Sequence, residues 1–468
     1  MRKIRKGLKI FQTYPKVICL CIGYIYICMN FFVKTTPEHR ITHNQMTGIT
    51  YFTDKGVDGE TRAKTTKIDK QTDIRNIPKC NMSSYIAYGS DICLTVLSER
   101  KISLPTDVIM DKMLKLSQQK ITETEAGSRN HLNDYYSLSR EENCSIDKVI
   151  QHCHTLRESY MYGKHNTTTE EKLYPLAFAM KIHTHGNQAH RLLRYIYHKH
   201  NIYCIHIDEK ADIEIYKRFK LIESCFDNII VIEDRVRVVY STIRVVEAEL
   251  KCMIALSAST TKWKYYINLT GQEFMLKTNA ELVKILKAMN GTNDIESYPV
   301  PFTEYHKFKQ RTLIINESPI ITRQKKQGFR QNIIIHKGSA YGMFSREFVN
   351  FILNDNFVKD FLIWLRDTYA PEELIWATLQ VLPGTPGGRS NSISSKDIYI
   401  SRAVKWQMDQ TVTCHGKYVH WICIYGLEDL PWLLSHRNIV ANKFYEDFDP
   451  LALYCVENIM YLRLMHGK

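Results

Sequence analysis

The sequence lacks the patterns by which most nucleotide-binding and nucleic-acid-binding proteins are detected. It contains no zinc-finger, RNP or P-loop pattern, so nothing in it favours a nucleic-acid partner. No Gly-x-Gly-x-x-Gly follows its first predicted strand, which excludes the fingerprint of nicotinamide dinucleotide binding. It also contains no internal repeat, which excludes solenoids and propellers.

The composition is that of a folded protein with a modest excess of positive charge. The chain has 468 residues, of which 44% are hydrophobic and 24% charged, so it is too apolar to be a disordered chain. Its 63 basic and 49 acidic residues give a net charge of +14. Six of the basic residues fall in the first sixteen positions, and the remaining +8 (14 − 6) fits an anionic small ligand.

The amino terminus predicts a membrane anchor. Residues 1–16 form a basic tail without acids, and residues 17–33 are uncharged, at the short end for a membrane span. A cleavable signal peptide is the alternative, but no small-residue cleavage site follows in FFVKTTPEHR. The positive tail predicts a type II protein with a lumenal body. Polar residues 34–147 then read as a stem, and residues 148–468 as the catalytic domain.

Cysteines and sequons agree with a lumenal body. Three of the 13 cysteines lie in the predicted anchor, and the ten that remain are expected to form disulfides in an oxidising compartment. Six Asn-x-Ser/Thr sequons follow as candidate glycosylation sites: Asn81, Asn143, Asn166, Asn268, Asn290 and Asn316.

From residue 173 to residue 270 the pattern predicts parallel β-α-β units. Short apolar runs at 173–183, 201–208, 228–234 and 262–270 alternate with runs of helical periodicity at 186–200, 211–226 and 241–259. His183, Asp208 and Asp234 fall at or near the ends of predicted strands, where parallel sheets bind ligands. After residue 290 the regularity weakens, and the basic stretch 304–337 reads as a loop.

The string Pro371-Glu372-Glu373-Leu374 is the sharpest chemical feature. Proline and acids suit the first turn of a helix, so two solvated glutamates on a capped helix are one interpretation. The other is a general base beside a cleft, since transfer of a sugar onto a hydroxyl needs a carboxylate to take the acceptor proton.

Several strings together resemble one known family. NIYCIHID, KWKYYINLTGQEF, GSAY, PEELIWATL, VKW and ANKF occur in this order, and the chain from Cys153 to Cys455 resembles the β-1,6-N-acetylglucosaminyltransferases, the core 2 and I-branching enzymes of glycosyltransferase family 14. The resemblance implies an α/β, GT-A-like glycosyltransferase domain with a mostly parallel sheet. It also implies a Golgi enzyme that moves GlcNAc from UDP-GlcNAc to the 6-hydroxyl of an acceptor sugar, with inversion and without a metal or other cofactor.

The resemblance also assigns site residues. Glu373 takes the place of the catalytic base. The positions that match donor-binding residues are His183, Asp208, His420 and Lys443. Those that match acceptor-binding residues are Glu296, Lys307 and Trp406. The implied disulfides are Cys153–Cys225, Cys204–Cys252, Cys414–Cys423 and Cys80–Cys455, which leaves Cys93 and Cys144 as an extra pair. The implied partners are a UDP-sugar, a glycan or glycoprotein acceptor, and a second copy or another Golgi transferase.

Three positions depart from the family pattern. His420 stands where the family has an arginine for the diphosphate, Met408 replaces an aromatic residue, and Glu304 reverses a charge. Imidazole offers fewer donors than guanidinium, so we expect a weaker contact there unless Lys417 substitutes. A lumenal pseudoenzyme that binds glycan and a transferase that uses another UDP-sugar remain alternatives.

Two metal interpretations are weaker. Asp447-Phe448-Asp449 is a D-x-D string, but it lies near the carboxyl end of the chain and not at the end of a core strand. His183, His185 and His190 recur at close spacing, but no cysteine or acid completes a tetrahedral set.

Overall fold

The computed structural model describes residues 152–389 apart from residue 165, residues 399–466, and six residues before them: Cys93, Leu97, Arg100, Lys101, Ile102 and Leu104. The predicted tail and anchor lie outside the described residues, as do most of the predicted stem, Asn81 and Asn143. Among the described helices none combines the length and the hydropathy of a membrane span.

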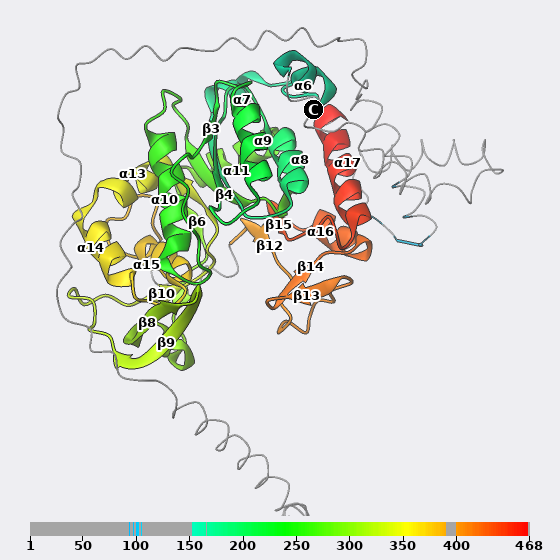
Figure 1. Ribbon diagram of the computed structural model, residues 1–468. Helices are drawn as coiled ribbons and strands as arrows, with labels where there is room; N and C mark the ends of the chain where they lie inside the picture. Colours follow the sequence, from blue (N-terminus) through cyan, green and yellow to red (C-terminus); the bar gives the residue numbers. More distant parts are fainter. Residues whose placement is uncertain are drawn as a thin grey trace, which may run out of the picture. The chain divides into compact units, whose positions relative to one another are not determined.

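A mostly parallel sheet forms the centre of the fold (Figure 1). Strand β1 pairs in parallel with β2 on one side and with β4 on the other, β2 continues in parallel to β3, and β11 runs antiparallel to both β4 and β6. In spatial order the strands are β3 (Ile229–Val231), β2 (Ile202–Ile207), β1 (Leu176–Ile182), β4 (Tyr265–Thr270), β11 (Gly342–Ser345) and β6 (Asp294–Ile295).

The two faces of this sheet bury separate cores. Because successive side chains of a strand point to opposite faces, Phe178 and Met180 of β1 enter one core while Ala177 and Ala179 enter the other. The first core is closed by α8 (Gly186–Ile196), α9 (Ile213–Glu223), α11 (Asn279–Met289) and α17 (Pro450–His466). The second is closed by α10 (Ile243–Ser257), α13 (Arg346–Asn354), α14 (Asn356–Leu365) and α15 (Ile375–Gln380). This confirms the alternation predicted for residues 173–270.

Smaller elements complete the domain. Two short helices, α6 (Cys153–Ser159) and α7 (Thr169–Leu173), precede the sheet. A three-stranded sheet joins β5 (Glu273–Met275), β15 (Val440–Asn442) and β12 (Arg402–Ala403). The remaining elements are β7 (Tyr298–Pro299), β10 (His336–Lys337), η2 (Phe302–Glu304), α12 (His306–Lys309), η3 (Pro371–Glu373), η4 (Leu427–Asp429) and α16 (Leu430–Ser435).

Two hairpins lie at the lower end of the view in Figure 1: β8 (Gln310–Ile315) with β9 (Ser318–Lys325), and β13 (Lys417–Val419) with β14 (Ile422–Ile424). The first hairpin corrects the prediction of a loop over 304–337. Its turn, Asn316-Glu317, takes two positive φ angles of 48° and 59°. Hairpin turns of this kind normally show a glycine, so the sequence carried no clear turn signal.

The disulfides agree with the resemblance in three of four pairs. The structure contains Cys153–Cys225, Cys204–Cys252 and Cys414–Cys423. However, Cys455 of α17 pairs with Cys93, so the predicted Cys80–Cys455 bridge and the extra Cys93–Cys144 pair are wrong. Cys93 and its neighbour Leu97 are buried in the first core, which anchors part of the predicted stem to the domain. Cys80 and Cys144 lie outside the described residues.

The described sequons fall into two groups. Asn166, Asn290 and Asn316 are exposed, and they stay candidates for glycosylation. Asn268 is fully buried in β4, where its amide donates to the carbonyl of Ala340 and accepts from the N–H of Gly342. A side chain held in this way cannot carry a glycan in the folded domain. The prediction of Asn268 as a glycosylation site is therefore wrong.

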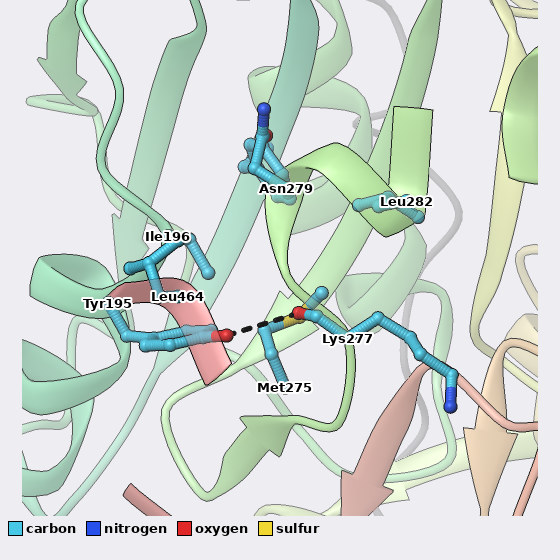
Figure 2. Close-up of a pocket in the computed structure, with 8 residues that line it drawn as sticks. Tyr195, Ile196, Met275, Lys277, Asn279, Leu282 and Leu464 are labelled. Carbon is cyan, nitrogen blue, oxygen red and sulfur yellow. Dashed lines mark hydrogen bonds between the residues drawn. The ribbon is translucent and has the colours of Figure 1, made fainter. Parts of the chain in front are cut away.

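A cavity of about 10 Å³ lies in the first core, between α8, α11 and α17 (Figure 2). Tyr195, Met275, Leu282 and Leu464 are among its lining residues, and the Tyr195 hydroxyl donates to the carbonyl of Lys277. This volume holds roughly one water molecule, so the cavity is a packing defect and not a sugar site.

Candidate active site

Two of the predicted donor-side residues follow neighbouring strands. His183 comes directly after β1 and is open to solvent, whereas Asp208 follows β2 and is 7% exposed. The Asp208 carboxylate accepts the N–H groups of Lys210 (3.0 Å) and Val238 (3.3 Å). Asp208 therefore shapes the loop after β3 as well as the edge of the site.

Buried His206 of β2 holds the same loop. Its Nε2 accepts the N–H of Val236 at 2.9 Å, which requires a neutral imidazole with its proton on Nδ1. Burial, together with the positive charge of Lys181, lowers the pKa of His206 to about 4, so the ring stays neutral at neutral pH.

Both hairpin tips contact the loop between β3 and α10. Glu317, at the turn of β8–β9, accepts from Arg237 Nε at 2.6 Å. The ring of His420, at the turn of β13–β14, stacks on Tyr240 with centroids 5.9 Å apart. The loop is therefore fixed from two sides, and the tip of β13–β14 lies directly over it.

The backbone of Lys443 is fixed by its neighbours on both sides. Asn442 donates to Glu273 at 2.6 Å, and the N–H of Phe444 donates to the carbonyl of Gln272 at 2.9 Å. The carbonyl of Lys443 itself accepts from the N–H of Tyr425 at 3.0 Å. These contacts leave only the side chain of Lys443 free to move.

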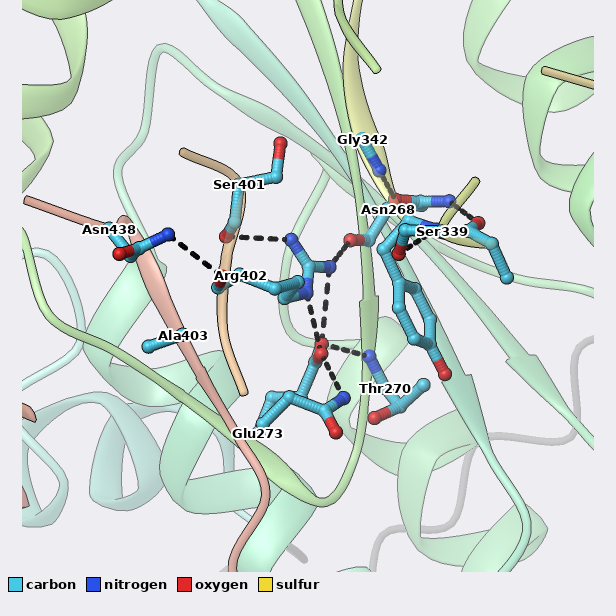
Figure 3. A network of polar contacts seen from close by, with 12 residues as sticks. Asn268, Thr270, Glu273, Ser339, Gly342, Ser401, Arg402, Ala403 and Asn438 are labelled. Atoms are coloured by element: carbon cyan, nitrogen blue, oxygen red, sulfur yellow. Dashed lines mark hydrogen bonds and ion pairs between the residues drawn. The ribbon is translucent and has the colours of Figure 1, made fainter. Parts of the chain in front are cut away.

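A buried ion pair between Arg402 and Glu273 (Figure 3) holds Asn442, the residue before Lys443. Arg402 and Glu273 both have fully buried side chains, and they meet at 2.6 Å. Glu273 also accepts the N–H of Thr270 at 2.8 Å, and Arg402 reaches the carbonyl of Asn268. A buried ion pair with all its donors satisfied is costly to break, so it makes a rigid support for the Asn442–Lys443 segment.

The side chains around Lys443 are aromatic or cationic. Its Nζ lies 5.1 Å from the centre of the Tyr445 ring, and the His185 ring stacks on Tyr445 at 5.2 Å. Partial burial and the charge of Lys443 lower the pKa of His183, and the nearby carboxylate of Asp208 opposes them. The charges of Lys443 and Asp208 therefore both act on His183.

The predicted base Glu373 belongs to a four-charge network with Lys307, Lys337 and Glu304. Its Oε2 lies 3.3 Å from Lys337 Nζ and 3.8 Å from Lys307 Nζ. Glu304 accepts from the same two lysines, at 2.6 Å and 2.5 Å. Two carboxylates and two ammonium groups thus balance one another around Glu373. The predicted acceptor residue Lys307 is brought to the base.

The network sets the charge of its own members. Burial alone would raise the pKa of Glu304, but the hydrogen bonds from Lys307 and Lys337 outweigh it and lower that pKa. Burial of Lys337 acts to lower its pKa, yet the carboxylates of Glu373 and Glu304 raise it well above the usual range. Lys337 therefore stays charged at the pH of any cellular compartment.

The two adjacent glutamates differ sharply. The Glu373 side chain keeps 34% of its surface exposed, and its Oε2 makes no hydrogen bond within the described part of the chain. Glu372 is 8% exposed, and burial raises the pKa of its carboxyl to about 8. Glu372 therefore keeps its proton at neutral pH, whereas the Glu373 carboxyl group lies beside the ammonium groups of Lys307 and Lys337.

Gly338, the first residue of the GSAY string, brings the backbone of Glu296 close to the backbone of Glu373. Gly338 donates its N–H to the carbonyl of Glu373 at 2.8 Å, and a Cβ at Gly338 would lie 1.7 Å from the carbonyl oxygen of Glu296. Only glycine permits this approach. Tyr298 lies among the same groups, since burial and the charges of Glu296, Glu304 and Glu373 raise its pKa to about 12.

The remaining predicted acceptor residue lies beside the β13–β14 hairpin. Trp406 forms a backbone bridge with Ile422 and leaves 46% of its surface exposed. Met408, which replaces a family aromatic residue, is 75% exposed. Two exposed indoles thus lie at this hairpin: Trp406 beside it, and Trp421, 61% exposed, in the turn that carries His420.

The acids of the D-x-D string already have partners. Asp447 lies 3.2 Å from His185 Nε2, and Asp449 accepts backbone N–H groups from Leu427 and Ala452 at the start of α17. His190 is buried on α8 against Tyr160, apart from this pair. These roles account for the residues behind both metal interpretations.

Sequence reasoning missed Lys337, Tyr240 and Tyr445. Lys337 stands directly before GSAY, and Tyr445 stands two residues after Lys443. Lys337 and Tyr445 are thus adjacent to strings that resemble the family, but their roles depend on contacts with residues that are distant in the sequence.

Comparison with known proteins shows the family of the chain. The family profile described as Core-2/I-Branching enzyme matches residues 176–434. The chain is 34% identical over 344 residues to the human protein named beta-1,3-galactosyl-O-glycosyl-glycoprotein beta-1,6-N-acetylglucosaminyltransferase 3, a match that covers 71% of this chain and 76% of the relative. It is 40% identical over 300 residues to the mouse N-acetyllactosaminide beta-1,6-N-acetylglucosaminyl-transferase, covering 62% and 73%. It is 36% identical over 329 residues to the human protein of that name, covering 69% and 81%. The chain therefore belongs to the Core-2/I-branching enzyme family.

Proposed function

We propose that this protein transfers GlcNAc from UDP-GlcNAc to the 6-hydroxyl of an acceptor sugar, with inversion at the anomeric carbon and without a metal ion. The names of its relatives support the donor sugar and the linkage. The observation that carries the proposal is the contrast between the two adjacent glutamates, because one is a buried acid and the other an open carboxylate beside two lysines.

In the proposed reaction Glu373 takes the proton of the acceptor 6-hydroxyl as its oxygen attacks the anomeric carbon of GlcNAc. The bond from that carbon to the β-phosphate oxygen breaks, and its electron pair leaves with UDP. General base catalysis of this kind contributes about 10²–10⁴-fold. Lys307 and Lys337 hold Glu373 in place.

We assign the departing diphosphate to the side of the site where Lys443 lies. Its ammonium group can neutralise the charge that develops on UDP, which is the role that a divalent ion has in many transferases. His183 and Asp208 would face the uridine and its ribose. Glu296 and Trp406 would hold the acceptor, by hydrogen bonding and by stacking on the indole respectively. An α/β domain of GT-A type would place both substrates at the ends of the parallel strands.

We also propose that the chain is a single-pass type II protein of the Golgi membrane. The basic tail and the uncharged run at 17–33 support the orientation. Four disulfides in the described part of the chain support an oxidising lumen.

The test is turnover by the full-length protein in detergent. It is incubated with UDP-GlcNAc in the presence of EDTA and a panel of core 1, core 3 and poly-lactosamine acceptors, and the linkage of the product is determined by NMR. A β-1,6-linked product that forms in EDTA supports the proposal. A metal requirement, a different linkage, or binding of UDP with no product on any acceptor would contradict it.

A further inference from the structure

The donor side of the site contains a second cation that the sequence resemblance did not assign. Lys417 lies on β13 with its Nζ 4.5 Å from the centre of the Phe448 ring and 6.0 Å from the centre of the Tyr445 ring. Lys443 approaches the same Tyr445 ring to 5.1 Å. One aromatic side chain therefore lies between two ammonium groups.

The hairpin register brings the two lysines together. Lys417 pairs with Ile424 across β13–β14, and the next residue, Tyr425, donates its N–H to the carbonyl of Lys443 at 3.0 Å. Gly416 permits the close approach, because a Cβ there would lie 1.8 Å from the carbonyl oxygen of Ile424. The positions of both lysines are thus set by backbone contacts.

No carboxylate compensates these two charges. Neither Lys417 nor Lys443 forms an ion pair with another residue in the described part of the chain, although most lysines near the site do. Asp447 lies 3.2 Å from His185 Nε2, and the His185 ring stacks on Tyr445. Two neighbouring ammonium groups without a counter-ion repel each other, and a dianionic ligand between them would remove that repulsion.

His420 is directed elsewhere. It occupies the turn of the hairpin with a φ of 49°, and its ring stacks on Tyr240 with an angle of 19° between the planes. Tyr240 lies close to Glu372 and Glu373, whose charges contribute to raising its pKa, although burial is the larger cause. The imidazole therefore faces the loop near the base, while Lys417 faces the cluster around Lys443.

We infer that Lys417 and Lys443 together bind the diphosphate of the nucleotide sugar, so that Lys417 supplies the cationic contact that His420 does not. This inference rests on the proposed function. It adds Lys417 as a residue that binds the diphosphate of the leaving UDP. A charged hydrogen bond to phosphate corresponds to about a tenfold change in affinity or more.

The experiment measures the affinity of the full-length protein for UDP and for UMP by calorimetry. We expect Lys417→Met to weaken UDP binding about tenfold and UMP binding much less, because UMP lacks the second phosphate. Lys417→Arg should restore most of the affinity for UDP, since it keeps the charge. Lys359→Met, which removes an exposed cation from α14, is the matched control and should bind UDP like the wild type.

The outcomes separate the two proposals. If Lys443→Ala weakens UDP binding but Lys417→Met does not, the inference is wrong and the proposed function stands. A loss of UDP affinity in His420→Ala that exceeds the loss in Lys417→Met would also overturn the inference. If the wild type binds neither UDP nor UDP-GlcNAc, the proposed function itself fails.

Discussion

The acceptor side and the donor side of this site handle charge in opposite ways. Around Glu373, two carboxylates and two lysines compensate one another within the folded chain. Around Tyr445, Lys417 and Lys443 have no carboxylate partner among the described residues. A self-compensated network suits a neutral sugar acceptor whose proton must be removed. An uncompensated pair suits an anionic donor, because the ligand brings the missing charge.

The largest effect should come from removing the base. In Glu373→Gln the carboxylate is lost while the shape is kept, so we expect turnover to fall about 10²–10⁴-fold. Glu372→Gln replaces a carboxyl that is already protonated at neutral pH, and it should stay within a few-fold of the wild type. Steady-state kinetics with UDP-GlcNAc check both variants. Equal losses in the two would mean that Glu373 is not distinguished as the base.

The next effect should come from removing Lys337, which contacts both Glu304 and Glu373. Lys337→Met leaves Glu304 and Glu373 with Lys307 alone, so the base loses its position. We expect turnover to fall about 10–100-fold with unchanged affinity for UDP. Lys337→Arg, which keeps the charge, serves as the control. If Lys337→Met also lost affinity for UDP, the network around Glu373 would contribute to donor binding, and the two sides of the site would not be separate.

The sequence predicted the donor side of the fold better than the acceptor side. Residues 173–270 alternate between strand and helix patterns, and the structure follows them with boundaries shifted by a few residues. The acceptor side depends on Lys337 and on the stretch 304–337, where the hairpin β8–β9 turns through Asn316 and Glu317 without a glycine. Periodicity cannot show which distant charges will meet.

One of the four predicted disulfides was wrong for a related reason. The resemblance paired Cys455 with Cys80, and spacing alone does not choose between possible partners. The choice of Cys93 follows from the packing of Cys93 and Leu97 into the first core, a tertiary fact. By contrast, the resemblance already selected Glu373 of the adjacent pair as the base, and the structure adds that Glu372 is buried while Glu373 is partly exposed.

A smaller effect concerns the stability of the folded protein. Folded Glu372 keeps its proton up to about pH 8, whereas an ordinary glutamate loses it near 4.5. Between these values the folded state binds more protons than the unfolded state, so this group's contribution to the free energy of unfolding falls as pH rises. Glu372→Gln cannot ionise. Relative to the wild type it should therefore gain about 3–4 kcal/mol in the free energy of unfolding as pH rises from 5 to 8. Thermal unfolding curves that shift in parallel for both proteins would contradict this.

The smallest effect should be the response to salt. Exposed, uncompensated lysines are screened by mobile ions, so raising the salt concentration about tenfold should weaken UDP binding several-fold. The KM for a neutral acceptor should change less, since its binding residues are already compensated. Calorimetry and kinetics at two salt concentrations check this. If salt changed UDP affinity and the acceptor KM equally, the proposed electrostatic difference between the two sides would be wrong.

The claim that the base and the diphosphate site belong to separate charge clusters is tested most directly by measuring UDP affinity in Glu373→Gln and in Lys443→Ala. We predict that Glu373→Gln binds UDP like the wild type although its turnover falls about 10²–10⁴-fold. Lys443→Ala should lose at least about tenfold in affinity for UDP. If Glu373→Gln loses UDP binding, or if Lys443→Ala keeps it, the assignment of the base and of the diphosphate site to separate charge clusters is wrong.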